Sequence, residues 1–400
     1  MTGLAAEQGL RRPLAVAFGF GLIALFVMAG ALGIAAGVAI AGLLALPSVD
    51  ELKKLLPLEL PFAIFLIFIA WAWASTAWSP YPSSDQAWKM ALGAPLYSLF
   101  AYAVWSLRGP GRLLALYAAF IGLLLIFLIY LIEAVTGLFS SFFSEGLVRG
   151  QMLRDATRGV SALVCATPAL WAFCTMIMPG RNGILAATFF GLLAAFLSWK
   201  FGLSSGVIAV VVATILFGIG WFYPRTTILL VGISAVAAFV LAPIFMPILL
   251  ENARNVALPV TWEVRLDIWQ NTIQHISEKP LFGWGLDASR TFQDKYQLAG
   301  QASDYRPMHP HNVGLHVWLE TGLIGVLLFA SAILALAIRV SSSWCLTRNQ
   351  GATIAASAGA ILVFSLLTYG AWQEWLWGCV AWVAAMCFLV GPEPEKAADQ

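Results

Sequence analysis

Long apolar stretches, separated by short polar or glycine- and proline-containing breaks, run through almost the whole 400-residue chain. An apolar stretch of about 17 to 25 residues is long enough to cross the hydrocarbon core of a bilayer as one helix. The pattern predicts an all-α polytopic membrane protein with about twelve membrane-spanning helices. The expected spans lie near residues 14–29, 31–46, 61–78, 88–107, 112–132, 157–178, 183–199, 203–222, 226–250, 314–338, 351–369 and 372–390.

The first two spans come from one uncharged run, Leu14 to Leu46. At 1.5 Å per residue a single helix of this length would measure roughly 50 Å, too long for one crossing of a core about 30 Å thick. Gly30 and Gly33 offer a place to turn. Splitting the run puts a set of basic residues on the cytoplasmic side, as the positive-inside rule favours: Arg11, Arg12, Lys53, Lys54, Arg108, Arg112, Arg181, Arg225, Arg339 and Arg348. We therefore expect both termini in the cytoplasm and an uncleaved first span.

Composition agrees with this class, since 60% of the residues are hydrophobic and 10% are charged. The formal net charge of +2 gives no reason to expect a nucleic-acid partner. We expect three regions. Residues 1–250 hold nine spans with short loops, residues 251–313 form one large loop on the outer side, and residues 314–400 hold three spans and a short cytoplasmic tail.

Two outer segments carry basic residues against the positive-inside bias. Arg149, Arg154 and Arg158 lie in and just after a short loop at 134–156, and the long loop carries Arg254, Arg265, Lys279, Arg290, Lys295 and Arg306. Because arginine makes bidentate hydrogen bonds to phosphate, the clusters predict binding of an anionic group such as a diphosphate. Arg154 and Arg158 are favoured over Arg149, since a spacing of four places them on one helix face. The alternative is that both merely extend toward the interface from the start of a span.

The long loop begins with a predicted amphipathic helix. Its apolar stripe recurs at steps of three and four: Trp262, Leu266, Trp269, Ile273 and Ile276. Such a helix is expected to lie flat on the bilayer and to present Arg265 at headgroup depth. The alternative is an ordinary packing helix with a solvated arginine. The following Pro280-Leu-Phe-Gly-Trp-Gly285 segment predicts a tight turn.

All four histidines, His275, His309, His311 and His316, fall within one 42-residue window that runs from this loop into the start of the next span. Pro310 disfavours helix at His309, and Asn312 can cap the span that follows, which holds His311 at the helix start. A neutral imidazole there could act as a general base toward a sugar hydroxyl, and the positive end of the helix would help to keep it neutral.

Three other interpretations of these histidines stay open. His309, His311 and His316 could ligate a metal, although no cysteine is near. His316 could form a structural hydrogen bond with Glu320, four residues later on the same helix face. His311 could be structural or merely interfacial. Gly314, Gly322 and Gly325 lie on one helix face and would admit close approach of a neighbouring span.

The sequence His311-Asn312, nine residues, then Gly322-Leu-Ile-Gly325 resembles the His-[Asn/Ser/Gln]-x9-Gly-x-x-[Gly/Thr/Tyr] signature of the O-antigen ligases of Gram-negative bacteria. The Arg265 to Trp269 segment and the Pro280 to Gly285 turn are likewise similar to the segment preceding that signature in the wider ligase and polymerase superfamily. The resemblance covers the whole chain in topology and about 65 residues in motif.

The resemblance implies a metal-independent, GT-C-like glycosyltransferase without cofactors, in the inner membrane with a periplasmic active site. It would transfer O-antigen polysaccharide from undecaprenyl diphosphate to the lipid A core in lipopolysaccharide biosynthesis. His311 would activate the acceptor hydroxyl, and Arg265 with Arg154 or Arg158 would hold the diphosphate. Further substrate contacts are expected from Lys89, Asn312, Arg149, His309, Arg290 and Arg306. No Asp-x-Asp pair occurs in the chain to hold a metal-bound diphosphate.

Two alternative functions remain. An O-antigen polymerase or a protein O-oligosaccharyltransferase would use the same lipid-linked donor with another acceptor, and the short loop at 134–156 favours the ligase. A multi-pass transporter would show paired ionisable residues near the bilayer midplane and two related halves. The chain has almost no charge within its spans beyond Glu320 and shows no such symmetry.

Overall fold

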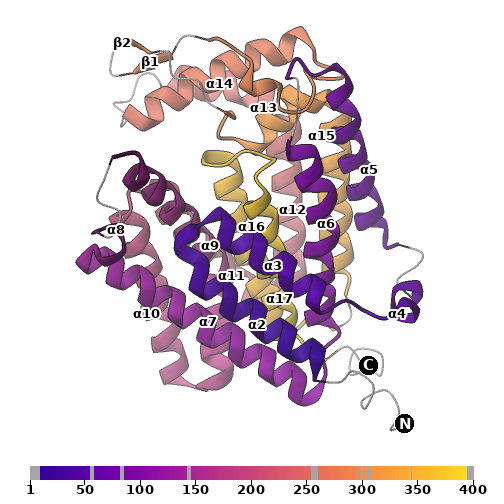
Figure 1. Ribbon diagram of the computed structural model, residues 1–400, viewed down its shortest axis with the longest axis vertical. Coiled ribbons are helices and arrows are strands. Elements are labelled where there is room, and N and C mark those ends of the chain that lie inside the picture. The colour runs from indigo at the N-terminus through magenta and orange to yellow at the C-terminus, as the bar shows by residue number, and fades with distance from the viewer. Residues whose placement is uncertain are drawn as a thin grey trace.

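The computed structural model describes residues 10–54, 58–81, 85–141, 146–253, 260–294, 296–298, 301–303, 308–343 and 345–393 (Figure 1). Most of them are helical. The helices of the amino-terminal half are α2 (Arg11–Phe26), η1 (Val27–Ala29), α3 (Ala31–Leu44), α4 (Val49–Lys54), α5 (Leu60–Ala74), η2 (Ser75–Trp78), α6 (Asp85–Trp105), α7 (Gly109–Thr136), α8 (Leu138–Ser141) and α9 (Gly146–Ile177).

The carboxyl-terminal half continues with α10 (Arg181–Lys200), α11 (Ser204–Phe222), α12 (Pro224–Val240), α13 (Ala242–Ala253), α14 (Val260–Glu278), η3 (Ala288–Arg290), α15 (Val313–Ser341), α16 (Arg348–Leu367) and α17 (Glu374–Val390). A two-stranded antiparallel hairpin lies between η3 and α15. It consists of β1 (Tyr296–Leu298) and β2 (Gln301–Ser303), with Tyr296 opposite Ser303.

Among the described residues, eight helices are long and apolar enough to cross a membrane, or nine if the bent pair α12 and α13 is one span. The prediction of an all-α polytopic membrane protein is therefore confirmed. Each of the twelve predicted spans overlaps a helix, but the apolar helices α3 and α17 are too short for this test of a span, and α6 is not among the helices that pass it. The count of twelve stays a prediction.

The expected turn at Gly30 is present. Gly30 has φ +56° and separates α2 with η1 from α3, so the long uncharged run folds as two helices. A Cβ at Gly30 would lie 2.5 Å from the carbonyl oxygen of Asp155 in α9, which leaves no room for a larger residue. A left-handed backbone and a close approach of another chain segment both favour glycine here.

Two predicted segments differ in detail from the structure. The span expected at 226–250 bends by 80° between α12 and α13. Pro243, which has no N–H, cannot donate to the carbonyl of Phe239, and the indole of Trp318 donates to that oxygen instead at 2.9 Å. The loop expected at 134–156 is also mostly helical, because α9 begins at Gly146 and carries Arg154 and Arg158 within its first turns.

Most of the basic residues assigned to one side of the membrane meet at one end of the bundle. Arg12 pairs with Glu51 at 2.8 Å and donates to Ser106, which joins α2, α4 and the end of α6. Arg112 at the start of α7 donates to the carbonyl oxygen of Gly391, 2.7 Å away, just after α17. The helices α13 and α14 and the hairpin lie at the opposite end, where the long loop was expected (Figure 1).

Helix α15 is broken at Gly322, whose φ of 62° and ψ of −166° are not helical. The turn at Pro280 to Gly285 inserts into this break, with a Cβ at Gly283 lying 2.5 Å from the carbonyl carbon of Glu320 and one at Gly322 only 2.4 Å from the carbonyl oxygen of Leu281. Gly322 therefore admits this turn, and the expected approach of a neighbouring span at Gly322 is wrong.

The backbone groups that the break frees all find partners in or beside the turn, which is what makes the break tolerable inside a membrane protein. Leu323 N–H donates to Pro280 O at 2.9 Å, and the indole N–H of Trp71 donates to Thr321 O at 3.0 Å. In the other direction, two turn amides donate to helix carbonyls at 2.8 Å each: Trp284 N to Leu319 O and Gly285 N to Glu320 O.

Replacing Gly322 by alanine should destabilise the protein by at least roughly 2 kcal/mol, because the backbone region at this position is nearly closed to other residues and the new methyl group meets Leu281. The measurement is thermal unfolding of the detergent-purified protein. Gly218→Ala is the matched control, since Gly218 lies in helix α11 with nothing within 4 Å of its Cβ position. Equal unfolding temperatures for the two variants would contradict the role given to Gly322.

Candidate active site

Helix α14 packs on the protein rather than on a membrane surface. Leu266, Trp269 and Ile276 of the predicted apolar stripe are buried against side chains of α13 and α15. The expectation that the stripe lies on the bilayer is therefore wrong, and the alternative of a packing helix is right. The stripe is apolar because it completes a protein core. Trp269 also donates its indole N–H to Pro310 O at 2.8 Å, which fixes α14 to the segment that carries His309 and His311.

His311 lies immediately before α15, where the side chain of Asn312 caps the helix by accepting the N–H of Leu315 at 2.9 Å. Nδ1 of His311 is 2.8 Å from the carbonyl oxygen of Thr368. A carbonyl oxygen only accepts, so Nδ1 carries the proton and the neutral ring keeps its lone pair on Nε2. His311 has φ +56°, which is a left-handed conformation. This conformation is costly for any residue other than glycine and tends to occur at functional sites.

His309 contacts His311 directly. Its Nδ1 accepts the backbone N–H of His311 at 3.1 Å, and the ring centroids are 4.4 Å apart. The side chain of Gln373, just before α17, reaches Nε2 of His309 at 2.9 Å. The histidine pair is thus held between the start of α15 and the segment that joins α16 to α17.

Burial is the main reason why both imidazoles stay neutral. Loss of hydration, with a smaller contribution from the positive charge of Arg265, lowers the pKa of His311 to about 4, and the hydrogen bond to Thr368 opposes this shift. Burial likewise holds the pKa of His309 well below its ordinary value, with smaller contributions from the charges of Arg158 and Arg290. Both rings are therefore uncharged at neutral pH.

Three guanidinium groups from three separate elements act electrostatically on the histidine pair, Arg265 on His311 and Arg158 and Arg290 on His309. Arg265 of α14 lies over the ring of Trp262, with 5.0 Å from its guanidinium carbon to the ring centroid. Arg158 of α9 pairs with Asp155 at 2.8 Å, and Arg290 of η3 pairs with Asp287 at 2.9 Å. The fold thus brings a neutral imidazole and a set of fixed cations together.

His316 and Glu320 form the structural pair that their spacing predicted, with Nε2 of His316 3.1 Å from a carboxylate oxygen. Glu320 is fully buried and also accepts the backbone N–H groups of Asp287 and Ser289 at 2.8 and 3.0 Å. The indole N–H of Trp372 is a further donor to it. Among the described residues, no three His, Cys, Asp or Glu side chains are grouped to hold a metal ion.

Other predicted site residues lie at the margin of this arrangement or outside it. Arg154 is exposed one turn before Arg158 and donates to Gln151 at 2.6 Å. Lys89 is 3.8 Å from Glu374 at the start of α17. Asn312 is 2% exposed and uses both ends of its amide inside the protein, as helix cap and as donor to Leu366 O, which gives it a positioning role. Arg149 lies in α9 with its side chain not described, and Arg306 falls outside the described residues.

The segment between α16 and α17 is the part of the site that the sequence did not predict. Thr368 supplies the carbonyl that orients His311, and Gln373 contacts His309. A Cβ at Gly370 would lie 2.8 Å from Cγ of His309 and 2.9 Å from Nδ1 of His316, so only glycine fits beside the two rings. A Gly-Ala-Trp-Gln sequence in so short a connection was the available signal, but it could equally have been an ordinary turn.

The fold and this histidine and arginine site define an integral-membrane protein with a polar site built at one end of its helices. Residues 186–330, which include Arg265 and the whole segment from His311 to Gly325, match the model of the family described as O-antigen ligase. A protein named "Putative polysaccharide ligase" from Rickettsia conorii is 32% identical over 139 residues, which is 32% of each chain. Another of the same name from Rickettsia bellii is 31% identical over 134 residues, again 32% of each chain.

A third protein with that name, from Rickettsia typhi, is 22% identical over 341 residues, covering 82% of this chain and 80% of the relative. The matches to the Rickettsia conorii and Rickettsia bellii proteins span about a third of the length of those relatives. No solved structure shows a significant match. Over residues 186–330 the chain is thus similar to the O-antigen ligase family, and its relatives carry the name of polysaccharide ligases.

The low pKa of His311 makes folding stability depend on pH. An unfolded histidine titrates near 6.5, whereas the folded group titrates near 4, so the unfolded state binds more protons between these values. The contribution of His311 to the free energy of unfolding should therefore be complete above pH 6.5 and should decrease by about 2–3 kcal/mol as the pH drops to 4. His311→Asn, which tolerates the left-handed backbone, should show a correspondingly smaller loss in pH-dependent thermal unfolding. Identical pH profiles for the two proteins would refute the assignment.

Proposed function

We propose that this protein is an O-antigen ligase. It transfers O-antigen polysaccharide from undecaprenyl diphosphate to the lipid A core, at the periplasmic face of the Gram-negative inner membrane and without a metal ion. The observation that carries the proposal is the hydrogen bond from Nδ1 of His311 to Thr368 O, which leaves Nε2 as a neutral base within the electrostatic reach of Arg265. The clustering of basic residues at the other end of the bundle supports the orientation.

In the proposed reaction, Nε2 of His311 takes the proton of an acceptor hydroxyl as its oxygen bonds to the anomeric carbon of the donor. The bond from that carbon to the diphosphate oxygen breaks at the same time, and direct displacement inverts the anomeric configuration. The proton ends on the imidazole and the electron pair of the broken bond ends on the diphosphate. Among the described residues, no hydrogen bond to Nε2 of His311 competes with the hydroxyl.

The arginines would neutralise the negative charge of the leaving group. A departing diphosphate gains negative charge, and fixed guanidinium groups aimed at it stabilise that charge without reorganising. Arg265 is the proposed principal contact, with Arg158 and Arg290 on the flanks and Lys89 further along the donor.

The same charges connect donor binding to the strength of the base. In the free protein, burial and the positive charge of Arg265 oppose protonation of His311. A bound diphosphate would bring negative charge to this arginine and so raise the pKa of the imidazole toward the ambient pH, where a general base is most effective. Donor binding would thereby prepare His311 for its task.

His311→Ala should lower the transfer rate by about 100- to 10,000-fold and Arg265→Ala by about 100- to 1,000-fold, because the first removes the base and the second a charge on the leaving group. The measurement is transfer from undecaprenyl-diphosphate glycan to lipid A core by the purified variants. Arg154→Ala is the matched control. Arg154 is exposed at the same outer end, so its replacement should lower the transfer rate much less. Near wild-type rates in either test variant, with unchanged purification and unfolding, would remove that residue from the mechanism.

An excess of chelator should leave the transfer rate unchanged, because the proposed site neutralises the leaving group with arginines. The assay compares initial rates of the wild-type protein with and without chelator, and then after added Mg²⁺. A sharp loss that Mg²⁺ restores would sink the proposal that arginines replace a metal.

The acceptor is decided by offering the purified protein the same donor with three acceptors in separate reactions. These are lipid A core, a pilin-type protein and a second donor molecule. Extension of lipid A core supports the ligase. Extension of the second donor would make the protein a polymerase, and extension of the pilin a protein O-oligosaccharyltransferase.

A further inference from the structure

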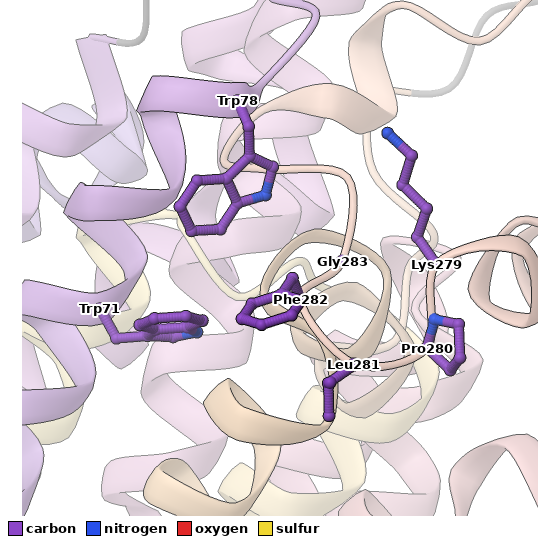
Figure 2. A pocket seen from close by; sticks show the side chains of 7 residues that line it. All are labelled: Trp71, Trp78, Lys279, Pro280, Leu281, Phe282 and Gly283. Carbon is purple, nitrogen blue, oxygen red and sulfur yellow. The ribbon is translucent and has the colours of Figure 1, made fainter.

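An open pocket of about 620 Å³, lined by aromatic and aliphatic side chains, lies apart from the His309 and His311 pair, neither of which lines it (Figure 2). It forms between the carboxyl-terminal end of α5 with η2 and the turn that enters the α15 break. Three aromatic rings line it, with centroids 5.6 Å apart for Trp71 and Trp78 and 6.1 Å apart for Trp71 and Phe282. The remaining lining residues are Lys279, Pro280, Leu281 and Gly283.

The apolar side chains of this pocket are exposed where a water-soluble protein would bury them. Leu281 is 49% exposed and Phe282 is 51% exposed, side by side on a turn. The neighbouring α5 and η2 form one apolar candidate span, and only 22% of its apolar window is buried inside the protein, which leaves the rest available for contact with lipid. The pocket therefore opens toward the bilayer near its outer surface, where tryptophan and lysine are commonly found together.

Among the described residues that line the pocket, Lys279 alone is charged. Its ammonium lies 3.9 Å from the ring centroid of Trp284, a cation–π contact that fixes the charge at the edge of the pocket. Among the described residues no carboxylate pairs with it. Figure 2 shows this ammonium on the side of the pocket where Trp78 lies, with Leu281 on the other side. The pocket is thus amphipathic, with a cation at one edge and hydrocarbon along the rest.

We propose that this pocket is a binding site for an anionic lipid of the outer leaflet. The chain of the lipid lies against Trp71, Phe282 and Leu281, and its phosphate contacts the ammonium of Lys279. The indole N–H of Trp78, which has no partner among the described residues, is a second donor. A sugar is a poor occupant, because its hydroxyls need several hydrogen-bonding groups and this lining offers one ammonium and one indole.

Binding at this position should also stabilise the fold. Pro280 and Leu281, which line the pocket, are the residues whose carbonyls accept Leu323 and Ile324 of the broken helix α15. A lipid that packs on the turn holds those carbonyls in place, and a ligand that binds only the folded state raises the unfolding temperature. The inference concerns lipid binding alone and does not rest on the proposed transferase activity.

The experiment uses the full-length protein purified in detergent and counts bound lipid by native mass spectrometry, with thermal unfolding as a second readout. Phosphatidylglycerol and phosphatidylethanolamine with the same acyl chains are the probes. The wild type should bind phosphatidylglycerol about fivefold more tightly, the preference expected from one well-placed lysine, and should unfold at a higher temperature with it. Lys279→Gln should remove the preference, and Phe282→Ala should weaken the binding of both lipids.

Lys200→Gln is the matched control, because Lys200 is likewise exposed beside an exposed tryptophan, Trp199, at the end of α10. It should keep the wild-type preference. Retention of the preference in Lys279→Gln, or its loss in Lys200→Gln as well, would place anionic lipid elsewhere and overturn the proposal. Displacement of the lipid by a soluble oligosaccharide would assign the pocket to a glycan instead. Lys279→Gln changes one exposed side chain, so the variant should fold like the wild type. An unchanged unfolding temperature in the absence of lipid checks this.

Discussion

The buried carboxylate of Glu320 is the interaction on which the arrangement of this site depends. A charged group excluded from water is costly unless donors surround it, and Glu320 has them from the backbone of the 287–289 segment, from His316 on its own helix and from Trp372. These donors belong to three chain segments that are far apart in sequence. Satisfying one carboxylate therefore fixes the loop after α14, the start of α15 and the connection between α16 and α17 against one another. The last of these carries Thr368, which orients His311.

The break in α15 requires of the backbone what Glu320 requires of a side chain, which is a hydrogen-bonding partner for every buried polar group. A helix can be interrupted inside a membrane protein only where its freed amide and carbonyl groups find new partners, and the turn at Pro280 to Gly285 supplies them. Glycine is needed on both sides of the contact, at Gly322 for its backbone conformation and at Gly283 for the close approach. One face of this turn holds the helix whose beginning carries the histidines, and the other forms the edge of the aromatic pocket. The histidine site and the aromatic pocket thus share a structural element.

Electrostatics in the site favours an anionic ligand over a proton. Burial and the charges of Arg265, Arg158 and Arg290 keep His309 and His311 neutral, so the free protein holds an uncharged base beside fixed positive charge. A diphosphate donor fits such a site because it compensates the cations and strengthens the base in one step. Much of the fold that creates this condition is ordinary packing of apolar helices. The polar groups that create it lie at one end of the bundle, opposite the end where Arg12 and Arg112 make their contacts.

The sequence by itself determined the class of the protein and the division of its first apolar run at Gly30. It also determined the Asn312 cap, the His316–Glu320 pair and the family signature, because each of these depends on residues that are near one another in the chain. It also marked Arg265, His309 and His311 as candidates. Only the tertiary structure decided what α14 packs against, that the chain bends before Pro243, and that Arg158 rather than the exposed Arg154 comes close to the histidines. Thr368, Gly370 and Gln373 could not be predicted, since their roles arise from contacts with residues more than 50 positions earlier in the chain. Periodicity and spacing report which face of a helix a residue occupies, whereas which segment packs there is settled by satisfying buried polar groups in three dimensions.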